Sequence, residues 1–325
     1  MKKIIGIGNA LVDVIVNIPN EEILNSFALP KGGMEMIDEA KKRKLHESIR
    51  DLKQTLASGG STSNTIHGIA RLGGAAGYMG KVGNDEMGSF FEKDMRKSHI
   101  QPHLIHTSTM DTGIATTLMT KDAERTFATY LGAASAMNIE DIDNEILKQY
   151  DCIHVEGYLI FNEPLILKVC QMAKANGMQI SMDMASYNLV QEHHDFISML
   201  LKDYVSIIFA NEEEAQAFTG KDGEEALDIL SKYCPVAVVK LGGKGSIANV
   251  HGQKISCATN GKKPVDTNGA GDAYAAGFLY GLLHDFSPEK TIRLASRLGD
   301  EMVTTIGAKL SDEQWERIRN EKELF

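Results

Sequence analysis

The feature that most restricts the fold of this chain is a repeated unit, in which an apolar segment runs into a glycine-containing loop and then into a helix-like segment. The unit is seen at 75–98 and repeatedly between 151 and 240, and the chain opens with a buried strand at 3–8 that also ends in glycine. Such units form parallel strands joined by helices. The loops that follow the strands then meet at one edge of the sheet, where open α/β sheets bind ligands. The sequence therefore predicts an α/β fold with its site at that edge.

Residues 102–130 interrupt this alternation. Short strand-like segments at 104–106, 114–120 and 126–130 follow one another with turns and no helix between them, which predicts an antiparallel insertion. The chain shows no internal repeat and no low-complexity linker. We therefore expect a single domain over residues 1–325 that carries this insertion.

The charge and hydropathy of the chain exclude two classes of partner. The net charge of −10 leaves no basic surface for nucleic acid. No apolar stretch approaches the ~20 residues of a membrane span. The apolar run after Met1-Lys2-Lys3 is too short for a signal peptide, so we expect a cytoplasmic protein without membrane or nucleic-acid partners. Both a monomer and a homodimer are compatible with the sequence.

The motif Asp-Thr-Asn-Gly-Ala-Gly-Asp at 266–272 leads into a helix of small residues. Backbone N–H groups converge readily in such a glycine-rich loop, and the N-terminus of a helix favours a bound anion. A carboxylate beside this anion site, here Asp272, is chemically reasonable if a hydroxyl lies between the two and gives up its proton during phosphoryl transfer. The alternative is a glycine-rich turn in which Asp272 only caps the helix.

The motif at 266–272 resembles the C-terminal signature of the ribokinase-like (PfkB) carbohydrate and nucleoside kinases, and the resemblance covers nearly the whole chain. It implies a three-layer α/β/α sandwich with a mostly parallel central sheet. It also implies a small β-sheet lid, made by segments at about 14–37 and 102–130, that excludes water from the substrate.

The resemblance also assigns the catalytic groups. In this family the last Asp of the motif is the catalytic base, which corresponds to Asp272. The preceding amides form an anion hole for the γ-phosphate of ATP, which corresponds to Gly269, Ala270 and Gly271.

Two segments near the N-terminus are similar to the family's substrate-binding elements. Asn9 and Asp13 match an early Gly-Asn-x-x-x-Asp element, and a carboxylate suits a vicinal diol because it accepts two hydrogen bonds. Gly59, Gly60 and Asn64 match the loop that holds substrate hydroxyls. The alternatives are an exposed edge-strand residue for Asp13 and a helix entry without a ligand for the glycine loop.

The nucleotide and metal sites are also implied by the resemblance. Asn211 and Glu214 match an Asn-x-x-Glu motif whose Glu lies near the water shell of Mg²⁺; the alternative is an acidic first turn of a helix. The residues expected to contact the nucleotide are Asn211, Lys240, Gly242, Gly243, Gly245 and Gly271. Arg125 is expected to reach the transferring phosphoryl group, although a surface arginine at a turn is an equal alternative. ATP and Mg²⁺ are the implied cofactors, and a need for K⁺ is left open.

These features predict an ATP-dependent kinase that phosphorylates a primary hydroxyl of a nucleoside or sugar. The nearer resemblance is to adenosine kinases, through the motifs at 8–13 and 59–64 and through Asn268. The segment 157–161 is only partly aromatic, so a ribose- or fructose-type sugar kinase remains the alternative. A non-catalytic nucleotide-binding regulator is a further alternative. A dinucleotide-binding oxidoreductase is disfavoured, because the third glycine is missing after Gly6-Ile7-Gly8.

Overall fold

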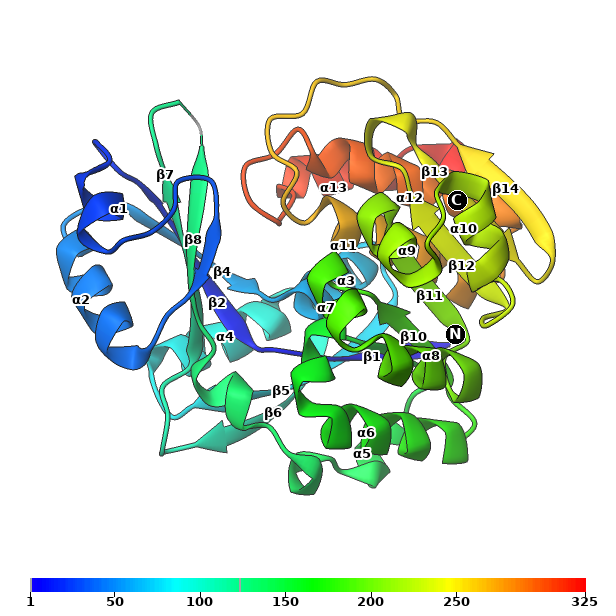
Figure 1. The fold of residues 1–325 in the computed structure, drawn as a ribbon, viewed down its shortest axis with the longest axis horizontal. Helices are drawn as coiled ribbons and strands as arrows, with labels where there is room; N and C mark the ends of the chain where they lie inside the picture. The colour runs from blue at the N-terminus through cyan, green and yellow to red at the C-terminus, as the bar shows by residue number, and fades with distance from the viewer. Residues whose placement is uncertain (1, 123) are drawn as a thin grey trace.

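The computed structural model describes residues 2–122 and 124–325; residue 1 and residue 123, which falls in the insertion expected at 102–130, lie outside the described residues. A nine-stranded sheet forms the centre of the fold (Figure 1). The first seven strands in the order below are parallel, and the last two add an antiparallel hairpin. In spatial order they are β6 (Ile100–Thr107), β5 (Ala75–Gly83), β1 (Lys3–Ile7), β9 (Cys152–Val155), β10 (Gln179–Asp183), β11 (Ile207–Asn211), β12 (Val236–Lys240), β13 (Ser246–Val250) and β14 (Gln253–Cys257).

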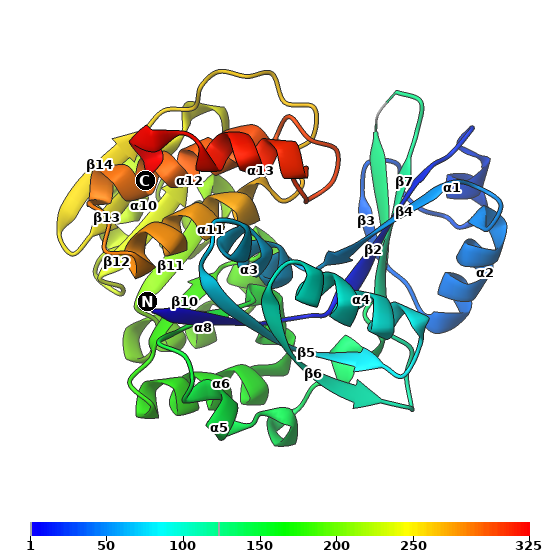
Figure 2. The same ribbon diagram turned by 180° about the vertical axis from the view of Figure 1, so that it is seen from behind.

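Helices cover both faces of this sheet, so the main body has three layers (Figures 1 and 2). One face carries α3 (Ser61–Arg71), α4 (Glu86–Lys97), α11 (Ala270–Leu283), α12 (Pro288–Met302) and α13 (Asp312–Arg319). The other carries α5 (Asn144–Leu147), α6 (Glu163–Ala175), α7 (Tyr187–Glu192), α8 (His194–Asp203), α9 (Glu212–Thr219) and α10 (Gly223–Leu230). Short 3₁₀ turns lie at η1 (Gly132–Ala136), η2 (Ile139–Asp141), η3 (Gly157–Asn162), η4 (Gly242–Lys244) and η5 (Lys322–Leu324).

The strands are buried on both faces because their side chains alternate between two apolar cores. Ile4 lies in the core beneath α3 and α11, whereas Ile5 and Ile7 lie in the core beneath α6 and α8. All three side chains are fully buried. Near-continuous apolar strands of this kind are typical of parallel sheets covered on both sides. The expected α/β fold with a mostly parallel central sheet is confirmed.

A second sheet of five strands stands beside the main body (Figure 1). Its strands in spatial order are β3 (Met34–Met36), β8 (Arg125–Tyr130), β7 (Gly113–Met119), β2 (Leu11–Asn17) and β4 (Gln54–Gly59). The helices α1 (Glu22–Ser26) and α2 (Glu39–Ile49) lie on the side of this sheet that faces away from the main body. The second, small sheet that the sequence predicted is therefore present.

The segment 104–106 is a strand, but the prediction that it belongs to the antiparallel insertion was wrong. This segment belongs to β6, which pairs in parallel with β5 from Ala76↔Ile100 to Gly83↔Thr107, at the edge of the main sheet. The helix α4 connects β5 to β6, so the strand–helix–strand pattern continues for one more unit before the chain enters the small sheet. In addition, β4 belongs to the small sheet, although it lies outside the segments expected to form it.

The helix α12 ends next to the loop that leads into α11. Its last residue is Met302. Just beyond it the carbonyl of Val303 accepts hydrogen bonds from the amides of Val265 and Asp266, so the helix end is held by the loop that leads into α11.

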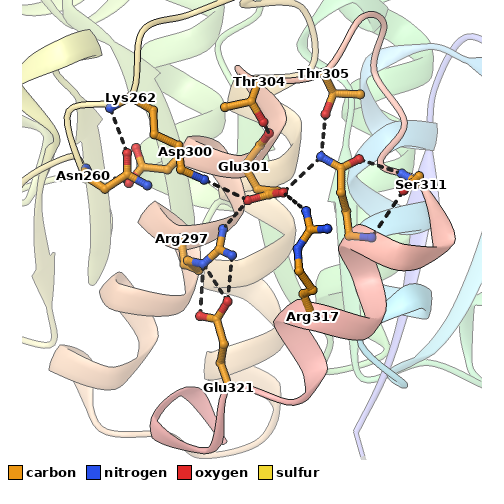
Figure 3. A network of polar contacts seen from close by, with 11 residues as sticks. Asn260, Lys262, Arg297, Asp300, Glu301, Thr304, Thr305, Ser311, Arg317 and Glu321 are labelled. Carbon is orange, nitrogen blue, oxygen red and sulfur yellow. Dashed lines mark hydrogen bonds and ion pairs between the residues drawn. The ribbon is translucent and has the colours of Figure 1, made fainter.

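A polar network connects the C-terminal helices to the same loop (Figure 3). The carboxylate of Glu301 in α12 accepts hydrogen bonds from Arg297, Arg317 and Gln314, and from Lys262 in the loop. The neighbouring Asp300 accepts a hydrogen bond from the amide of Asn260. Within the described residues, no helix combines the length and the apolar character needed to cross a membrane.

Candidate active site

A cavity of about 1020 Å³ lies between the carboxyl ends of the main-sheet strands and the small sheet. It brings together residues from both ends of the chain that the sequence had assigned to a site. Those that line it are Asn9, Asp13, Gly60, Asn64, Glu214, Lys240, Gly269, Gly271 and Asp272. The edge of the sheet that the strand–loop–helix pattern singled out is therefore where these residues meet.

Asp272 lies in the first turn of α11 and faces the start of α3. Its carboxylate accepts a hydrogen bond from the hydroxyl of Ser61 at 2.7 Å and from the side-chain amide of Asn64 at 3.1 Å. Burial raises the pKa of Asp272 to about 6, although these two hydrogen bonds oppose the shift. A carboxylate with this pKa is ionised at neutral pH and still basic enough to take a proton from a hydroxyl in a transition state.

The N-terminus of α11 is open to an anion. Gly269 precedes the helix with a φ of 72°, in the left-handed region, and no side chain of the described residues caps the first turn. A Cβ on Gly269 would come within 2.6 Å of the Cβ of Ala308, so glycine is required here by both conformation and space. The helix dipole and the amides at this end favour an anion such as phosphate, although the amide of Ala270 donates to the carbonyl of Thr267 at 3.3 Å.

The glycine pair at the start of α3 lies against Asn9 and Asp13, two residues that the sequence predicted to bind substrate. A Cβ on Gly59 would lie 2.1 Å from Oδ1 of Asp13, and a Cβ on Gly60 would lie 2.2 Å from the carbonyl oxygen of Asn9. The two motifs that the sequence treated separately therefore touch, because β2 and β4 pair antiparallel from Leu11↔Gly59 onward. Burial raises the pKa of Asp13 to about 7.

Three residues of the site were missed by the sequence analysis: Ser61, Glu156 and Asp183. The only signal of Ser61, described above, was its place beside the glycine pair. Glu156 follows β9, is 3% exposed and lines the cavity. It accepts hydrogen bonds from the side chain of Asn9 at 2.6 Å and from the amide of Thr62 at 3.3 Å. Burial raises the pKa of Glu156 to about 7.

Lys240 places a positive charge next to the anion site. Its ammonium lies 3.1 Å from where a Cβ of Gly271 would be, and it forms an ion pair of 2.9 Å with Asp183 at the end of β10. Burial by itself lowers the pKa of Lys240, but the carboxylates of Asp183 and Glu214 raise it, and the net result is a pKa above the ordinary value of lysine. Asp183 also lines the cavity and was not singled out from the sequence.

Glu214 is suited to a metal only through water. Asn211 donates to both of its carboxylate oxygens, from the backbone and from the side chain, at 2.8 Å in each case. Among residues 2–122 and 124–325, no group of three or more His, Cys, Asp or Glu side chains is placed to hold a metal ion directly. Mg²⁺ keeps several of its waters and prefers oxygen ligands, so the second-sphere position of Glu214 fits this ion.

Three glycines predicted to contact the nucleotide lie apart from Asp272. Gly242 and Gly243 are exposed in the turn η4, and Gly245 follows it. None of the three lines the cavity. The close approach of the loop to β14 requires glycine at 245, where a Cβ would come within 2.0 Å of the carbonyl oxygen of Cys257.

Arg125 also lies outside the main cavity. It forms an ion pair with Asp266, the first residue of the glycine motif, and both side chains are largely buried. The pair lines a smaller hollow of about 470 Å³, which shares Asn268 and Gly269 with the main cavity. Because β8 belongs to the small sheet, this ion pair connects the small sheet to the anion loop.

Another part of the cavity wall is formed by large apolar and aromatic side chains. Phe161 in η3 is 68% exposed, and Met34 and Met36 in β3 are 57% and 53% exposed. All three line the cavity, with Tyr158 and Phe127 also in its wall. One cavity thus combines a polar part around Asp272 with an apolar part that is open to a ligand.

Together with its known relatives, this site defines a phosphotransferase that has an alcohol group as acceptor. The chain belongs to the family of pfkB carbohydrate kinases, whose model matches residues 33–315. It is similar to the adenosine kinase of Saccharomyces cerevisiae, with 26% identity over 95% of this chain and 96% of that protein. It is also similar to the 5-dehydro-2-deoxygluconokinase of Geobacillus kaustophilus, with 26% identity over 80% of this chain and 84% of that protein.

Two solved structures share the whole fold. The adenosine kinase from Sinorhizobium meliloti is 30% identical and superposes with a TM-score of 0.86, over 98% of each chain. A probable sugar kinase from Rhizobium etli is 28% identical, with a TM-score of 0.87 over 99% of each chain. The fold is therefore that of the ribokinase-like kinases, and ATP is the phosphoryl donor expected of the family.

Proposed function

We propose that this protein is an ATP-dependent nucleoside kinase that transfers the γ-phosphoryl group to a primary hydroxyl of its acceptor, with adenosine as the favoured acceptor. The observation that carries the proposal is the composition of the cavity wall. Asp13, Asn64 and Asp272 offer polar groups to a sugar, while Phe161 and Met34 offer apolar surface to a base in the same cavity. A free sugar would leave that apolar surface in contact with water, which is unfavourable.

The polar groups orient the sugar. The ionised carboxylate of Asp13 accepts hydrogen bonds from two neighbouring hydroxyls. Asn64 already donates to Asp272 and keeps its side-chain oxygen, which has no partner among the described residues, for a further donor. Orientation of this kind is a large part of phosphoryl-transfer catalysis, because the protein supplies little covalent chemistry.

Asp272 accepts the proton of the primary hydroxyl as its oxygen attacks the γ-phosphorus. A new O–P bond forms, the bond between the γ-phosphorus and the bridging oxygen breaks, and ADP leaves with the electron pair of that bond. The amides of Gly269, Ala270 and Gly271 and the ammonium of Lys240 stabilise the negative charge on the transferring group. The proton is carried away on the Asp272 carboxyl.

The nucleotide is expected to extend from the anion site towards the loop at 240–245. Mg²⁺, when it is bound with ATP, neutralises charge on the phosphates, and Glu214 with Asn211 holds its water shell. Lys240 contributes a fixed charge there, since its pair with Asp183 keeps it protonated. Arg125 reaches the phosphoryl group only if it leaves or shares its contact with Asp266.

Solved structures and curated relatives support the nucleoside reading and also a second candidate. The relatives named adenosine kinase favour a nucleoside, whereas the probable sugar kinase of Rhizobium etli and the 5-dehydro-2-deoxygluconokinase of Geobacillus kaustophilus favour a sugar or sugar derivative. Both candidates use the same catalytic groups. They differ in whether the acceptor carries a base that contacts the apolar part of the cavity wall.

The test is ADP release from Mg·ATP against adenosine, inosine, guanosine, ribose, fructose and 2-keto-3-deoxygluconate, each with and without K⁺. We expect turnover with nucleosides and little with free sugars. The variant Phe161→Ala should raise the KM for adenosine about tenfold, since it removes an aromatic contact, while Ile306→Ala, an exposed apolar side chain outside the cavity, should not. Turnover with sugars alone would replace the nucleoside proposal by the sugar-kinase candidate.

A further inference from the structure

Lys309, which belongs to no sequence motif, lies next to the anion loop but outside the cavity. Lys309 belongs to the loop that follows α12, and this loop packs against the anion loop. The amide of Gly307 donates to Oδ2 of Asp266 at 2.7 Å. The space of a Cβ on Gly269 is filled by Ala308. The position of Lys309 is therefore fixed relative to the anion loop by the contacts of the two residues that precede it.

The ammonium of Lys309 is buried and has no hydrogen-bond partner among the described residues. The charged groups that act on it are Asp94 of α4, Asp13 of β2 and Asp272 of α11; it acts in turn on His67 of α3. Asp94 already accepts two hydrogen bonds, from the amide and the hydroxyl of Ser58. An unpaired ammonium is costly to bury, so its place among these carboxylates needs a reason.

Asp13 has the complementary property. It lines the cavity, and its side chain makes no hydrogen bond within the described part of the chain. Burial raises the pKa of Asp13, Lys309 opposes that shift, and the neighbouring Asp272 adds to it. Burial lowers the pKa of Lys309 to about 8, against the attraction of Asp94, Asp13 and Asp272. Asp13 and Asp272 thus share the wall of one cavity. Lys309 belongs to the loop that packs between them, since Ala308 fills the space beside Gly269 and a Cβ on Gly307 would lie 3.1 Å from the side chain of Ile15 in β2.

We propose that Lys309 is a positioning residue that favours the anionic form of Asp13, so that its carboxylate can accept the hydrogen bonds of two acceptor hydroxyls. Lys309 does not line the cavity, so it acts through Asp13 and not on the substrate. Without the ammonium, burial and the charge of Asp272 would protonate Asp13 at neutral pH. A protonated carboxyl would donate a hydrogen bond and lose acceptor capacity. The role of Asp13 in binding the acceptor rests on the proposed function, whereas the effect of Lys309 on the ionisation of Asp13 does not depend on it.

The charge of Asp13 can be measured in the unliganded enzyme. Aspartate labelled with ¹³C at the side-chain carboxyl is titrated by NMR in the wild type, Lys309→Met and Lys309→Arg, and Asp13→Asn identifies the signal. We expect Lys309→Met to move the Asp13 midpoint upward by roughly one pH unit or more, and Lys309→Arg to restore it. As a matched control, Lys42→Met removes another buried lysine, which pairs with Asp111 away from the cavity. An unchanged midpoint in Lys309→Met would overturn the inference.

Kinetics then connect the charge to binding. With adenosine as acceptor, Lys309→Met should raise the KM for adenosine about tenfold at pH 7. At pH 9, where Asp13 is ionised in both proteins, the KM of the variant should approach the wild-type value. The kcat should change less. An equal loss at every pH would show a merely structural role and overturn the inference. If the wild type does not phosphorylate adenosine, the proposed acceptor is wrong, and the NMR titration still decides the role of Lys309.

Discussion

Glu301 and Asp13 are both buried acidic side chains, yet their surroundings drive their pKa values in opposite directions. Glu301 is 3% exposed and belongs to the network that joins α12, α13 and the loop before α11 (Figure 3). Although burial favours the neutral acid, hydrogen bonds from four side chains lower the pKa of Glu301 to about 2; the donors are Arg297, Gln314, Lys262 and Arg317. Asp13 has no such donors, and its pKa rises to about 7.

The difference separates a group that stabilises the fold from a group that is available to a ligand. The carboxylate of Glu301 is satisfied by the protein, so it holds two helices and a loop together. The carboxylates of Asp13 and Asp272 are incompletely satisfied, so a substrate hydroxyl can supply what is missing. Groups of the second kind cost stability in the empty protein, which is a common property of active sites.

The largest effect is expected at Asp272, where only the chemistry should change. Asp272→Asn keeps the size of the side chain but removes the base, so kcat should fall by about 10²–10⁴-fold. Coupled ADP-release kinetics and thermal unfolding measure the two properties side by side. Asp195→Asn, a change at an exposed aspartate, is the control. Turnover close to that of the wild type would remove Asp272 from the role of base.

A smaller effect, on stability and not on chemistry, is expected at Glu301. Glu301→Gln leaves Arg297 without its charged partner inside α12. The free energy of unfolding should fall by about 2 kcal/mol, which is less than the roughly 3–5 kcal/mol of fully buried pairs because Arg317 and Lys262 are partly exposed. Denaturant unfolding at pH 7 measures the change.

The pH dependence of this loss has a definite sign. The pKa of Glu301 is lowered on folding, from 4.5 to about 2. Its stabilising effect is therefore fully present above pH 4.5 and is lost as the pH falls towards 2. The difference between the wild type and Glu301→Gln should narrow over that range. A difference that stays constant between pH 7 and pH 3 would contradict the charged role of Glu301.

The smallest effect is expected at Asp13, and it has the opposite sign. The pKa of Asp13 is raised on folding, so its ionisation disfavours the folded state above about pH 7 and has no such effect below 3.8. Asp13→Asn should therefore increase the unfolding free energy at pH 8 by about 1 kcal/mol while it weakens acceptor binding. Asp51→Asn, at an exposed site, is the control. A clear loss of stability at pH 8 would mean that Asp13 is satisfied within the protein.

Much of the fold could be predicted because parallel strands covered on both faces leave a strong apolar signal. The strand β6 was misassigned because it lies at the sheet edge, where only part of its surface is buried. Its Pro102 would interrupt a central strand but is tolerated in an edge strand, which has a partner on one side alone. The local pattern of polar residues and proline therefore resembled an insertion.

The site was predictable only where a motif marks it. Asp272, Asn64 and Asp13 stand in recognisable surroundings of glycine and asparagine. Glu156 and Lys309 do not, and they reach the site because β9 and the loop after α12 are brought beside α3 and α11 by the tertiary fold. Contacts between residues so far apart in the sequence depend on the packing of the whole domain, which no single segment encodes.

The ion pair between Arg125 and Asp266 joins the small sheet to the anion loop, and a bound anion can compete with Asp266 for the arginine. The same Asp266 accepts hydrogen bonds from the amides of Asn268 and Gly307, so it organises the anion loop from within. A bound phosphate that attracts Arg125 would replace Asp266 as the anionic partner of this arginine, so the net gain in affinity for phosphate is small. Because Arg125 belongs to the small sheet, that sheet would lose its ion pair with Asp266 when phosphate binds. Binding of an anion beside α11 would therefore change a contact that joins the small sheet to the main body.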